Sequence, residues 1–387
     1  MNITQILDAC TGCGVCAAAC PSAAVEMQPD AHGFLRPVVA DAACINCGLC
    51  TGKCPVSVLP QTSAHTDVLT GYAKDGALLP QSSSGAIFPV LAAEIIRRGG
   101  LVFGAAFDGQ FHVIHTAAES VEELSALCSS KYVQGRIPSD CYAQVKAALA
   151  AGRWVYFSGM PCQVAALKSY LGRDYDTLIT QDTACHSVPS PLVWEGYKAE
   201  LEKQYGGKLT AFSFRNKANG WEAYHIRAAF DNGREFAQPA AESPYQRGFI
   251  KGLYSRSSCF VCKFKGIERC SDITLADYWG VKGIQPDAYN PQGTSLILLH
   301  SEKGRSLLEG CKDQLQLQPA AKDAFAFNPA VLAPIQKPTR YDEFWAGYGQ
   351  TSFADLVSAC CEPTEEELAK ERRSKSLLAR VMRRLKR

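Results

Sequence analysis

The segments CTGCGVCAAACP, residues 10–21, and CINCGLCTGKCP, residues 44–55, are two copies of one cysteine pattern. In each copy, gaps of two, two and three residues separate four cysteines, and a proline follows the fourth. The chain has 387 residues and 18 cysteines, and eight of these cysteines belong to the two copies. Packing alone does not place cysteines at fixed intervals, so the pattern predicts thiolate ligands.

The spacing is typical of bacterial ferredoxins, in which three thiolates of one tight loop bind three irons of a 4Fe-4S cluster. The fourth cysteine, before the proline, reaches the other cluster. We therefore expect one cluster on Cys10, Cys13, Cys16 and Cys54 and a second on Cys20, Cys44, Cys47 and Cys50. Gly12, Gly14 and Gly48 let the backbone wrap closely around the clusters. A pair of zinc sites fits less well, because zinc takes its four ligands as one set.

Ten cysteines remain, and two of them follow apolar strands. Cys162 lies in VYFSGMPCQVAALKSYLG and Cys185 in LITQDTACHSVPSPLVW. Loops that follow strands form the sites of α/β folds. Cys162 and Cys185, together with the later pair Cys259 and Cys262, therefore suggest a third metal site. Cys270 is an alternative candidate for the fourth ligand. Alternatively, Cys162 is a nucleophilic thiolate at a helix N-terminus.

Composition excludes several classes of protein. The net charge is +2 and the mean hydropathy is −0.09, so nothing indicates a nucleic-acid binder. No apolar run is long enough to span a membrane, and the first residues do not resemble a secretion signal. We therefore expect a cytoplasmic protein whose cysteines serve metal ligation or redox chemistry rather than disulfides.

The pattern changes from residue 82 onward, where strands and helices alternate and predict a parallel or mixed sheet. The helix after Ser82 shows Ile87, Leu91 and Ile95 on one face. A strand pair is expected over 101–107 and 111–117, antiparallel strands over 208–216, 222–230 and 234–239, and a last strand over 294–300. The predicted fold class is an α+β ferredoxin-like module followed by an α/β core with a mixed sheet. The predicted domains are the two-cluster module 1–58, a linker 59–81, the core 82–340 and a C-terminal segment 341–387.

Two polar segments of the core could meet a phosphate or a flavin. The turn of Ser82, Ser83, Ser84 and Gly85 opens a helix, where N–H groups and hydroxyls can bind phosphate. A simple helix cap is the plainer interpretation of this turn. Lys131 follows a helix and could contact a phosphate or a flavin carbonyl. No G-x-G-x-x-G fingerprint follows any strand, so a Rossmann NAD site is not supported.

The tail 370–387, KERRSKSLLARVMRRLKR, has nine lysine or arginine residues and one glutamate. Five apolar residues share one face of a helix there. This basic amphipathic pattern predicts peripheral contact with an anionic membrane surface or an acidic partner, with a solvated tail as the alternative.

Six segments resemble one known family. They are SSSGAIFPVLAAEIIRRGGLVFGAAFD, SKYVQGRI, VYFSGMPCQVAALK, QDTACHSVPSPLVW, FRNKANGW and CFVCKFKGIERCSDITLADYWG. Together the chain resembles the beta subunit of coenzyme F420-reducing hydrogenase and formate dehydrogenase, in the bacterial form that a two-cluster ferredoxin module precedes. The resemblance covers about residues 5–300.

The resemblance implies an FAD held by Ser82, Ser83, Ser84, Gly85, Lys131, Tyr132 and Gln134. It also implies a third 4Fe-4S cluster on Cys162, Cys185, Cys259 and Cys262, with Cys270 incidental. Two residues depart from the family pattern, since Ser187 and Ala86 stand where glycine is commoner. Each could reshape the flavin pocket.

We therefore expect a flavin-dependent iron–sulfur oxidoreductase, in which FAD exchanges a hydride with a deazaflavin coenzyme or another organic two-electron substrate. The alternative is a non-catalytic electron-transfer subunit that docks on a larger or membrane-associated redox complex. Both need a redox partner protein or a low-potential donor, and we expect a homo-oligomer. Asp277 and His186 are polar candidates near the flavin, and no catalytic residue is assigned.

Overall fold

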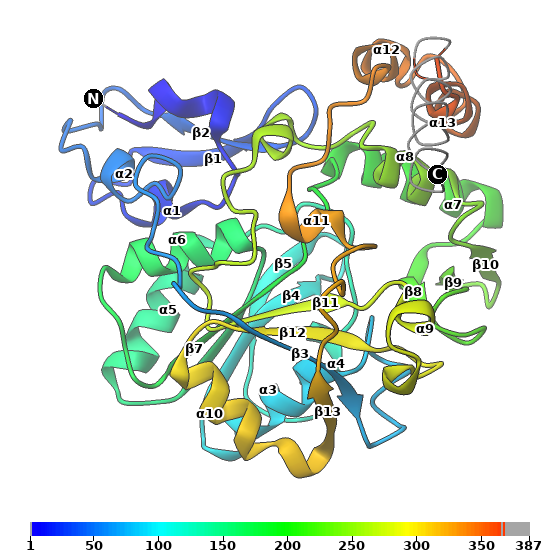
Figure 1. The fold of residues 1–387 in the computed structure, drawn as a ribbon. Helices are drawn as coiled ribbons and strands as arrows, with labels where there is room; N and C mark the ends of the chain where they lie inside the picture. Colours follow the sequence, from blue (N-terminus) through cyan, green and yellow to red (C-terminus); the bar gives the residue numbers. More distant parts are fainter. Residues whose placement is uncertain (1, 365–366, 368–387) are drawn as a thin grey trace, which may run out of the picture.

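The computed structural model describes residues 2–364 and residue 367 of the chain (Figure 1). Its centre is an eight-stranded mixed sheet with the strand order β13-β3-β12-β11-β7-β6-β4-β5. The strands are β3 (Asp67–Ala73), β4 (Leu101–Phe107), β5 (Val113–Ala118), β6 (Val155–Ser158), β7 (Leu178–Thr183), β11 (Ile273–Asp277), β12 (Ser295–Leu299) and β13 (Leu315–Pro319). The middle strands β4, β6, β7 and β11 run parallel, and the outer pairings are antiparallel. The predicted α/β core with a mixed sheet is confirmed.

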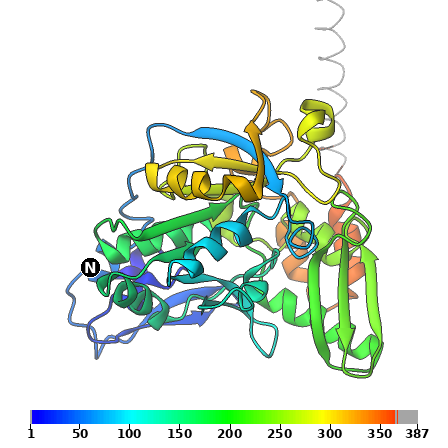
Figure 2. The same ribbon diagram turned by 90° about the horizontal axis from the view of Figure 1, so that it is seen from below.

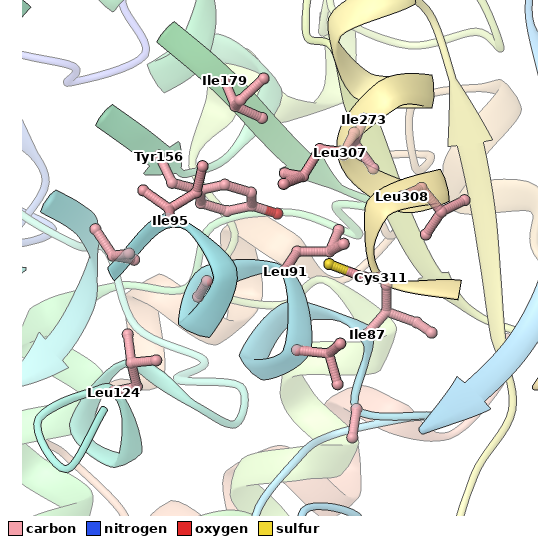
Figure 3. Close-up of a cluster of buried hydrophobic side chains, with 14 of the residues drawn as sticks. Ile87, Leu91, Ile95, Leu124, Tyr156, Ile179, Ile273, Leu307, Leu308 and Cys311 are labelled. Carbon is pink, nitrogen blue, oxygen red and sulfur yellow. The ribbon is translucent and has the colours of Figure 1, made fainter. Parts of the chain in front are cut away.

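Helices cover both faces of this sheet, because its central strands are apolar on both sides. On β6, Tyr156 packs with α3 (Ile87–Arg97) and α10 (Glu302–Gly310) in the cluster drawn in Figure 3. Its neighbours Val155 and Phe157 pack with α5 (Ser139–Ala150) and α6 (Pro161–Leu171) on the opposite face. The alternation follows from the two-residue period of a strand.

Two strands differ from the expectations. The predicted linker 59–81 contains β3, which lies between β12 and β13, so the core sheet begins before residue 82. Its apolar pattern is interrupted at Gly71, where a Cβ atom would lie 2.1 Å from the carbonyl oxygen of Gln316. The strand Ser295–Leu299 is not the last, because the short edge strand β13 follows it. Both errors come from strands whose partners are distant in sequence.

A second, three-stranded antiparallel sheet stands to one side of the core (Figure 2). Its strands are β8 (Leu209–Asn216), β9 (His225–Phe230) and β10 (Glu235–Pro239), as the sequence predicted. Aromatic side chains join it to the nearby helices. These helices are α7 (Pro191–Tyr205), α8 (Pro244–Lys251), α12 (Tyr341–Gly347) and α13 (Phe353–Cys361).

The N-terminal module is a small unit that lies on α5 and α6. It consists of η1 (Ile3–Ala9), α1 (Val15–Ala18), β1 (Val25–Pro29), β2 (Leu35–Val39) and α2 (Leu49–Gly52). The hydroxyl of Tyr142 on α5 donates to the carbonyl of Cys13 at 2.8 Å, and Lys53 donates to the carbonyl of Ser169 at the end of α6, also at 2.8 Å. Both cysteine loops are thereby tied to the core.

The remaining elements are short. They are α4 (Leu124–Leu127), η2 (Ser257–Val261), α9 (Val281–Ile284), η3 (Pro286–Ala288), η4 (Lys312–Gln314) and α11 (Pro329–Leu332). Within residues 2–364, no helix combines the length and the apolar character that crossing a membrane requires. The basic tail 370–387 lies outside the described residues.

Candidate functional site

A cavity of about 460 Å³ opens where the parallel strands of the core end. Ser158, Thr183 and Asp277, the last residues of β6, β7 and β11, line it. Thr11 and Gly12 from the first cysteine loop also line it. The carboxyl ends of parallel strands are where α/β sheets bind their ligands, so the cavity is the candidate site.

Four cysteines of the core come together beside this cavity. Burial raises the pKa of the Cys162 thiol well above its usual value, and neighbouring thiols raise it further. These neighbours are, in decreasing order, Cys185, Cys262, Cys13 and Cys259. The set is the one expected for a third cluster, with Cys13 of the module next to it. A raised pKa is also the opposite of what a nucleophilic Cys162 needs.

Cys270 is a fifth cysteine close to this set. Burial raises the pKa of its thiol to about 11, and the charges that act on it belong to Lys168, Asp182 and Arg269. Asp182 and Arg269 act on Cys185 as well, so the exclusion of Cys270 from the ligand set stays a prediction.

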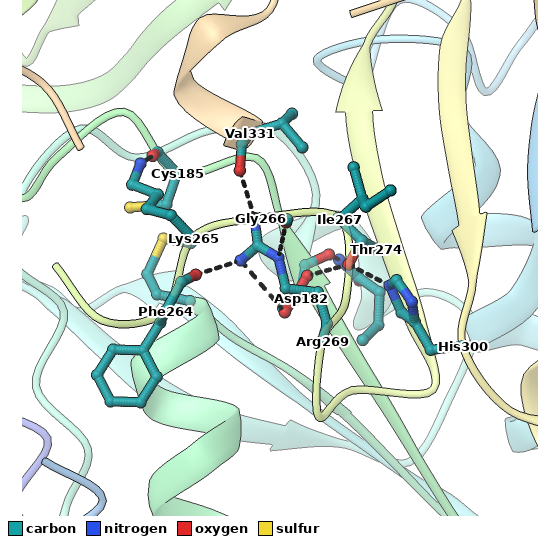
Figure 4. A network of polar contacts seen from close by, with 12 residues as sticks. Asp182, Cys185, Phe264, Lys265, Gly266, Ile267, Arg269, Thr274, His300 and Val331 are labelled. Carbon is teal, nitrogen blue, oxygen red and sulfur yellow. Dashed lines mark hydrogen bonds and ion pairs between the residues drawn. The ribbon is translucent and has the colours of Figure 1, made fainter. Parts of the chain in front are cut away.

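A buried ion pair fixes the loop of Cys262 (Figure 4). Arg269 donates to the carbonyl oxygens of Phe264 at 2.6 Å and Gly266 at 2.7 Å, and lies 3.8 Å from the carboxylate of Asp182. Asp182 is on β7, the strand that leads to Cys185. Burial raises the pKa of Asp182 to about 6, and the nearby guanidinium of Arg269 opposes the shift. The pair therefore holds two cysteine-bearing segments in register.

The first cysteine loop of the module is largely buried. Burial raises the pKa of Cys13 to about 12, and the thiols of Cys10 and Cys54 add to the shift. The pKa of Cys16 is raised by burial and by the other three thiols of the set, those of Cys13, Cys10 and Cys54. The structure thus brings together the four residues expected for the first cluster. Gly12 has the left-handed φ of +73° that lets its N–H face the sulfur of Cys10, at 3.4 Å.

The second cysteine loop faces outward. Cys47 is exposed, Cys44 and Cys20 are partly buried and Cys50 is buried. Cys20 and Cys50 belong to the small core of the module, and α1 packs beside α2. Assignment of the second cluster to these four cysteines stays a prediction.

The donor sets fit 4Fe-4S clusters chemically. Thiolates that lie close together in a poorly solvated place repel one another, and an iron–sulfur core supplies the positive charge that stabilises them as ligands. In the described part of the chain, no three His, Cys, Asp or Glu side chains are placed to hold a single metal ion. The thiolates of a cubane bind four different irons and lie farther apart than the ligands of one ion.

The serine turn also lines the cavity. The hydroxyl of Ser83 bonds Ser130 at 2.7 Å, and that of Ser84 donates to the carbonyl of Thr294 at 2.8 Å. None of these serines caps α3, because its N-cap is Ala86 in the left-handed region. The hydroxyl of Ser82 is buried, lines the cavity and has no hydrogen-bond partner among the described residues. It is therefore free for a ligand.

Lys131, Tyr132 and Gln134 also line the cavity. The ammonium of Lys131 donates to the carbonyl of Cys128 at 2.9 Å, and burial lowers its pKa to about 8. The ring of Tyr132 stacks on Phe249 with 4.7 Å between centroids. Gln134 accepts from the backbone N–H of Leu35 at 3.0 Å, so its amide links the core to the module. The flavin role that the resemblance implied for these three residues stays a prediction.

Arg215 is the most buried charged residue that lines the cavity, and the sequence did not predict it. It forms two hydrogen bonds with Asp277, at 3.0 and 3.1 Å, and donates to the carbonyl of Ser83 at 2.9 Å. Trp221 donates to the same carboxylate at 2.9 Å. Arg215 thereby fixes the serine turn from the second sheet. The conspicuous segment FRNKANGW could have indicated it, but nothing in the sequence near Arg215 shows its distant acid partner.

Asp277 and His186, the two polar candidates, both line the cavity. Asp277 is engaged by Arg215, and the ring of His186 contacts the carbonyl of Ile250 at 3.1 Å. Burial lowers the pKa of His186, and the charge of Lys265 lowers it further, which favours a neutral ring. Neither residue is placed in a catalytic role by these contacts.

Two segments of the chain match known protein families. Residues 152–323 match the family described as the C terminus of the coenzyme F420 hydrogenase/dehydrogenase beta subunit, and residues 9–58 match the 4Fe-4S dicluster domain. No curated protein matches the chain. Among solved structures, a chain of the F420-reducing nickel–iron hydrogenase complex from Methanosarcina barkeri shares 15% identity, with a TM-score of 0.45, over 68% of this chain and 87% of that chain.

Proposed function

We propose a function that follows from two family matches in one chain. One match is the 4Fe-4S dicluster domain, and the other is the C terminus of the coenzyme F420 hydrogenase/dehydrogenase beta subunit. The chain is an iron–sulfur flavoprotein oxidoreductase with three clusters and one FAD in the cavity. When bound, FAD would exchange a hydride, which carries two electrons with one proton, with an organic substrate. It would exchange single electrons with the clusters. The observation that carries the proposal is the lining of the cavity by the serine turn, Cys162, Cys185 and the first cysteine loop.

The residues of the cavity divide this task. Ser82 offers its free buried hydroxyl, and Lys131 offers a positive charge to the phosphates or a flavin carbonyl. Tyr132 and Phe249 present a stacked apolar wall that excludes water from the flavin. Cys162 and Cys185 would hold the third cluster at the edge of the cavity, and Cys13, an expected ligand of the first cluster, lies near Cys162.

The second cysteine loop is the place where a redox partner protein would dock. Cys47 is exposed there, and Ile45 and Leu49 expose 65% and 45% of their surface. A cluster with an exposed ligand can exchange electrons with another protein, whereas Cys13 and Cys16 of the first loop are buried. Electrons would therefore pass between the second, first and third clusters in that order.

The first experiment is a count of cofactors in protein purified without oxygen. We expect about twelve irons with equal acid-labile sulfide and one FAD per chain, as three cubanes and a flavin require. About eight irons without flavin would contradict the proposal and favour the alternative of a non-catalytic electron-transfer role. The three numbers come from colorimetric iron and sulfide assays and from the absorbance of released flavin.

The affinity for FAD is expected to fall as pH rises through 8. Lys131 has a pKa of about 8 in the absence of FAD, so it is charged below that pH and neutral above it. A bound anion favours the charged form, so affinity is highest below the pKa and is lost above it. Fluorescence titration of reconstituted protein between about pH 6.5 and 9.5 spans this change. In the Lys131→Gln variant the affinity should be weaker at the acidic end and should not change with pH, and a wild-type slope in this variant would contradict the role of Lys131.

A further inference from the structure

Arg256 connects the two parts of the chain that carry cysteine ligands. It directly precedes η2, the element that contains Cys259, and its own N–H donates to the carbonyl of Val188 at 2.9 Å. Its guanidinium reaches into the N-terminal module, where Nε donates to the carbonyl of Cys10 at 2.7 Å and Nη2 to that of Leu35 at 2.9 Å. The side chain therefore spans the gap between the first and the third cysteine sets.

The charge of Arg256 has no acid partner of its own among the described residues. Among the described residues, three arginines are almost fully buried, namely Arg215, Arg256 and Arg269. Arg215 and Arg269 each lie within 4 Å of an aspartate. Arg256 is 0% exposed, and its Nη1 is buried without any hydrogen-bond partner in the described structure. The nearby carboxylate of Asp30 pairs with Arg36 instead, at 3.0 Å. A buried cation without a counter-charge is strongly unfavourable, so this arrangement requires an anion.

Thiolates are the anions that the surroundings of Arg256 offer. Burial lowers the pKa of its guanidinium, and the thiols of Cys10 and Cys259 act in the opposite direction. Gly12 leaves room for the approach, since a Cβ atom there would lie 2.9 Å from Nη1. A 4Fe-4S cluster with four thiolate ligands carries net negative charge, which increases on reduction.

We propose that Arg256 is a counter-charge shared by two clusters, the one that Cys10 helps to hold and the one that Cys259 helps to hold. The proposal rests on the cluster assignment of the proposed function. A cation close to both clusters stabilises the reduced form of each and raises both reduction potentials together. Arg256 thus shifts both potentials in the same direction, so the energy of the step between module and core changes little.

An anaerobic redox titration followed by electron paramagnetic resonance tests this role. In Arg256→Gln, two of the three clusters should become harder to reduce, with the ratio of reduced to oxidised cluster at a fixed potential falling about tenfold, which is about 59 mV for one electron. The second cluster, expected on Cys20, Cys44, Cys47 and Cys50, should keep its potential. Arg256→Lys retains the charge and should retain most of the two potentials. Arg153→Gln removes a half-exposed surface arginine paired with Glu119 and serves as the control for loss of one charge.

The outcomes separate this inference from the function on which it rests. Wild-type protein with fewer than three clusters contradicts the proposed function itself. Full iron content with unchanged potentials in Arg256→Gln overturns the shared counter-charge and leaves the function intact. If Arg256→Gln loses clusters, the lysine variant decides. Retained clusters in Arg256→Lys support the charge, and equal loss in both variants overturns it by showing that only the hydrogen bonds to the module matter.

Discussion

Replacing Cys162 with alanine is expected to remove one whole cluster, about four irons of an expected twelve, and to leave about eight. Cys162 is partly buried and lies with three other core thiols, so a cluster there would lose one of its four protein ligands. The clusters of the N-terminal module have their own ligands and should remain. Loss of the third cluster would also cut the electron route to the cavity, so reduction of FAD by an external one-electron donor should become undetectable.

Iron and sulfide counts and the resonance spectrum of the reduced protein measure this effect. Cys270→Ala is the matched control, because Cys270 is a partly buried cysteine nearby that the proposed ligand set leaves out. Its iron content should equal that of the wild type. A Cys162→Ala protein with full iron, or a Cys270→Ala protein that lacks one cluster's iron, would show that the ligand set is wrong.

The second large effect is expected at Arg215. The Arg215→Met variant leaves Asp277 charged and only 17% exposed without its two guanidinium bonds, and it releases the carbonyl of Ser83. Removing one partner of a buried pair costs roughly 3–5 kcal/mol, because the remaining charge is uncompensated. The unfolding midpoint should fall by on the order of 10 °C. The serine turn also loses its link to the second sheet, so FAD should bind more weakly.

Anaerobic thermal unfolding followed by circular dichroism measures the stability. Arg227→Gln is the control, since Arg227 pairs with Glu235 at the surface, where an ion pair contributes at most about 1 kcal/mol. The double variant Arg215→Met with Asp277→Asn should recover part of the loss, because no unpaired charge remains. A midpoint for Arg215→Met equal to that of the Arg227→Gln control would contradict the role given to the pair.

The local patterns predicted most of this architecture. The doubled cysteine spacing, the alternation of strands and helices, and the hairpin of β4 and β5 follow from residues close in sequence, and the structure contains these elements. The grouping of Cys162 with Cys185, Cys259 and Cys262 came from strand-end context together with the family resemblance. The structure brings these four together, as the electrostatics of Cys162 show.

Other features depend on partners that are distant in sequence. Strand β3 pairs with β12 and β13, which follow it only after most of the core, so its own residues do not distinguish it from a linker. Arg215 and Asp277, or Arg256 and Cys10, become partners only after the sheets and the module pack together. The sequence alone does not show that a charged side chain is buried, because burial is a property of the tertiary fold.

The contrast between the two cysteine loops also bears on survival in air. Oxidants attack exposed sulfur and iron first, and Cys47 is exposed whereas Cys13 and Cys16 are buried. Damage by oxygen should therefore begin at the outer loop and spread inward, so that the protein first loses contact with its donor and only later its inner cofactors. In a cell, repair of the outer cluster alone would then restore electron transfer between the donor and the inner cofactors.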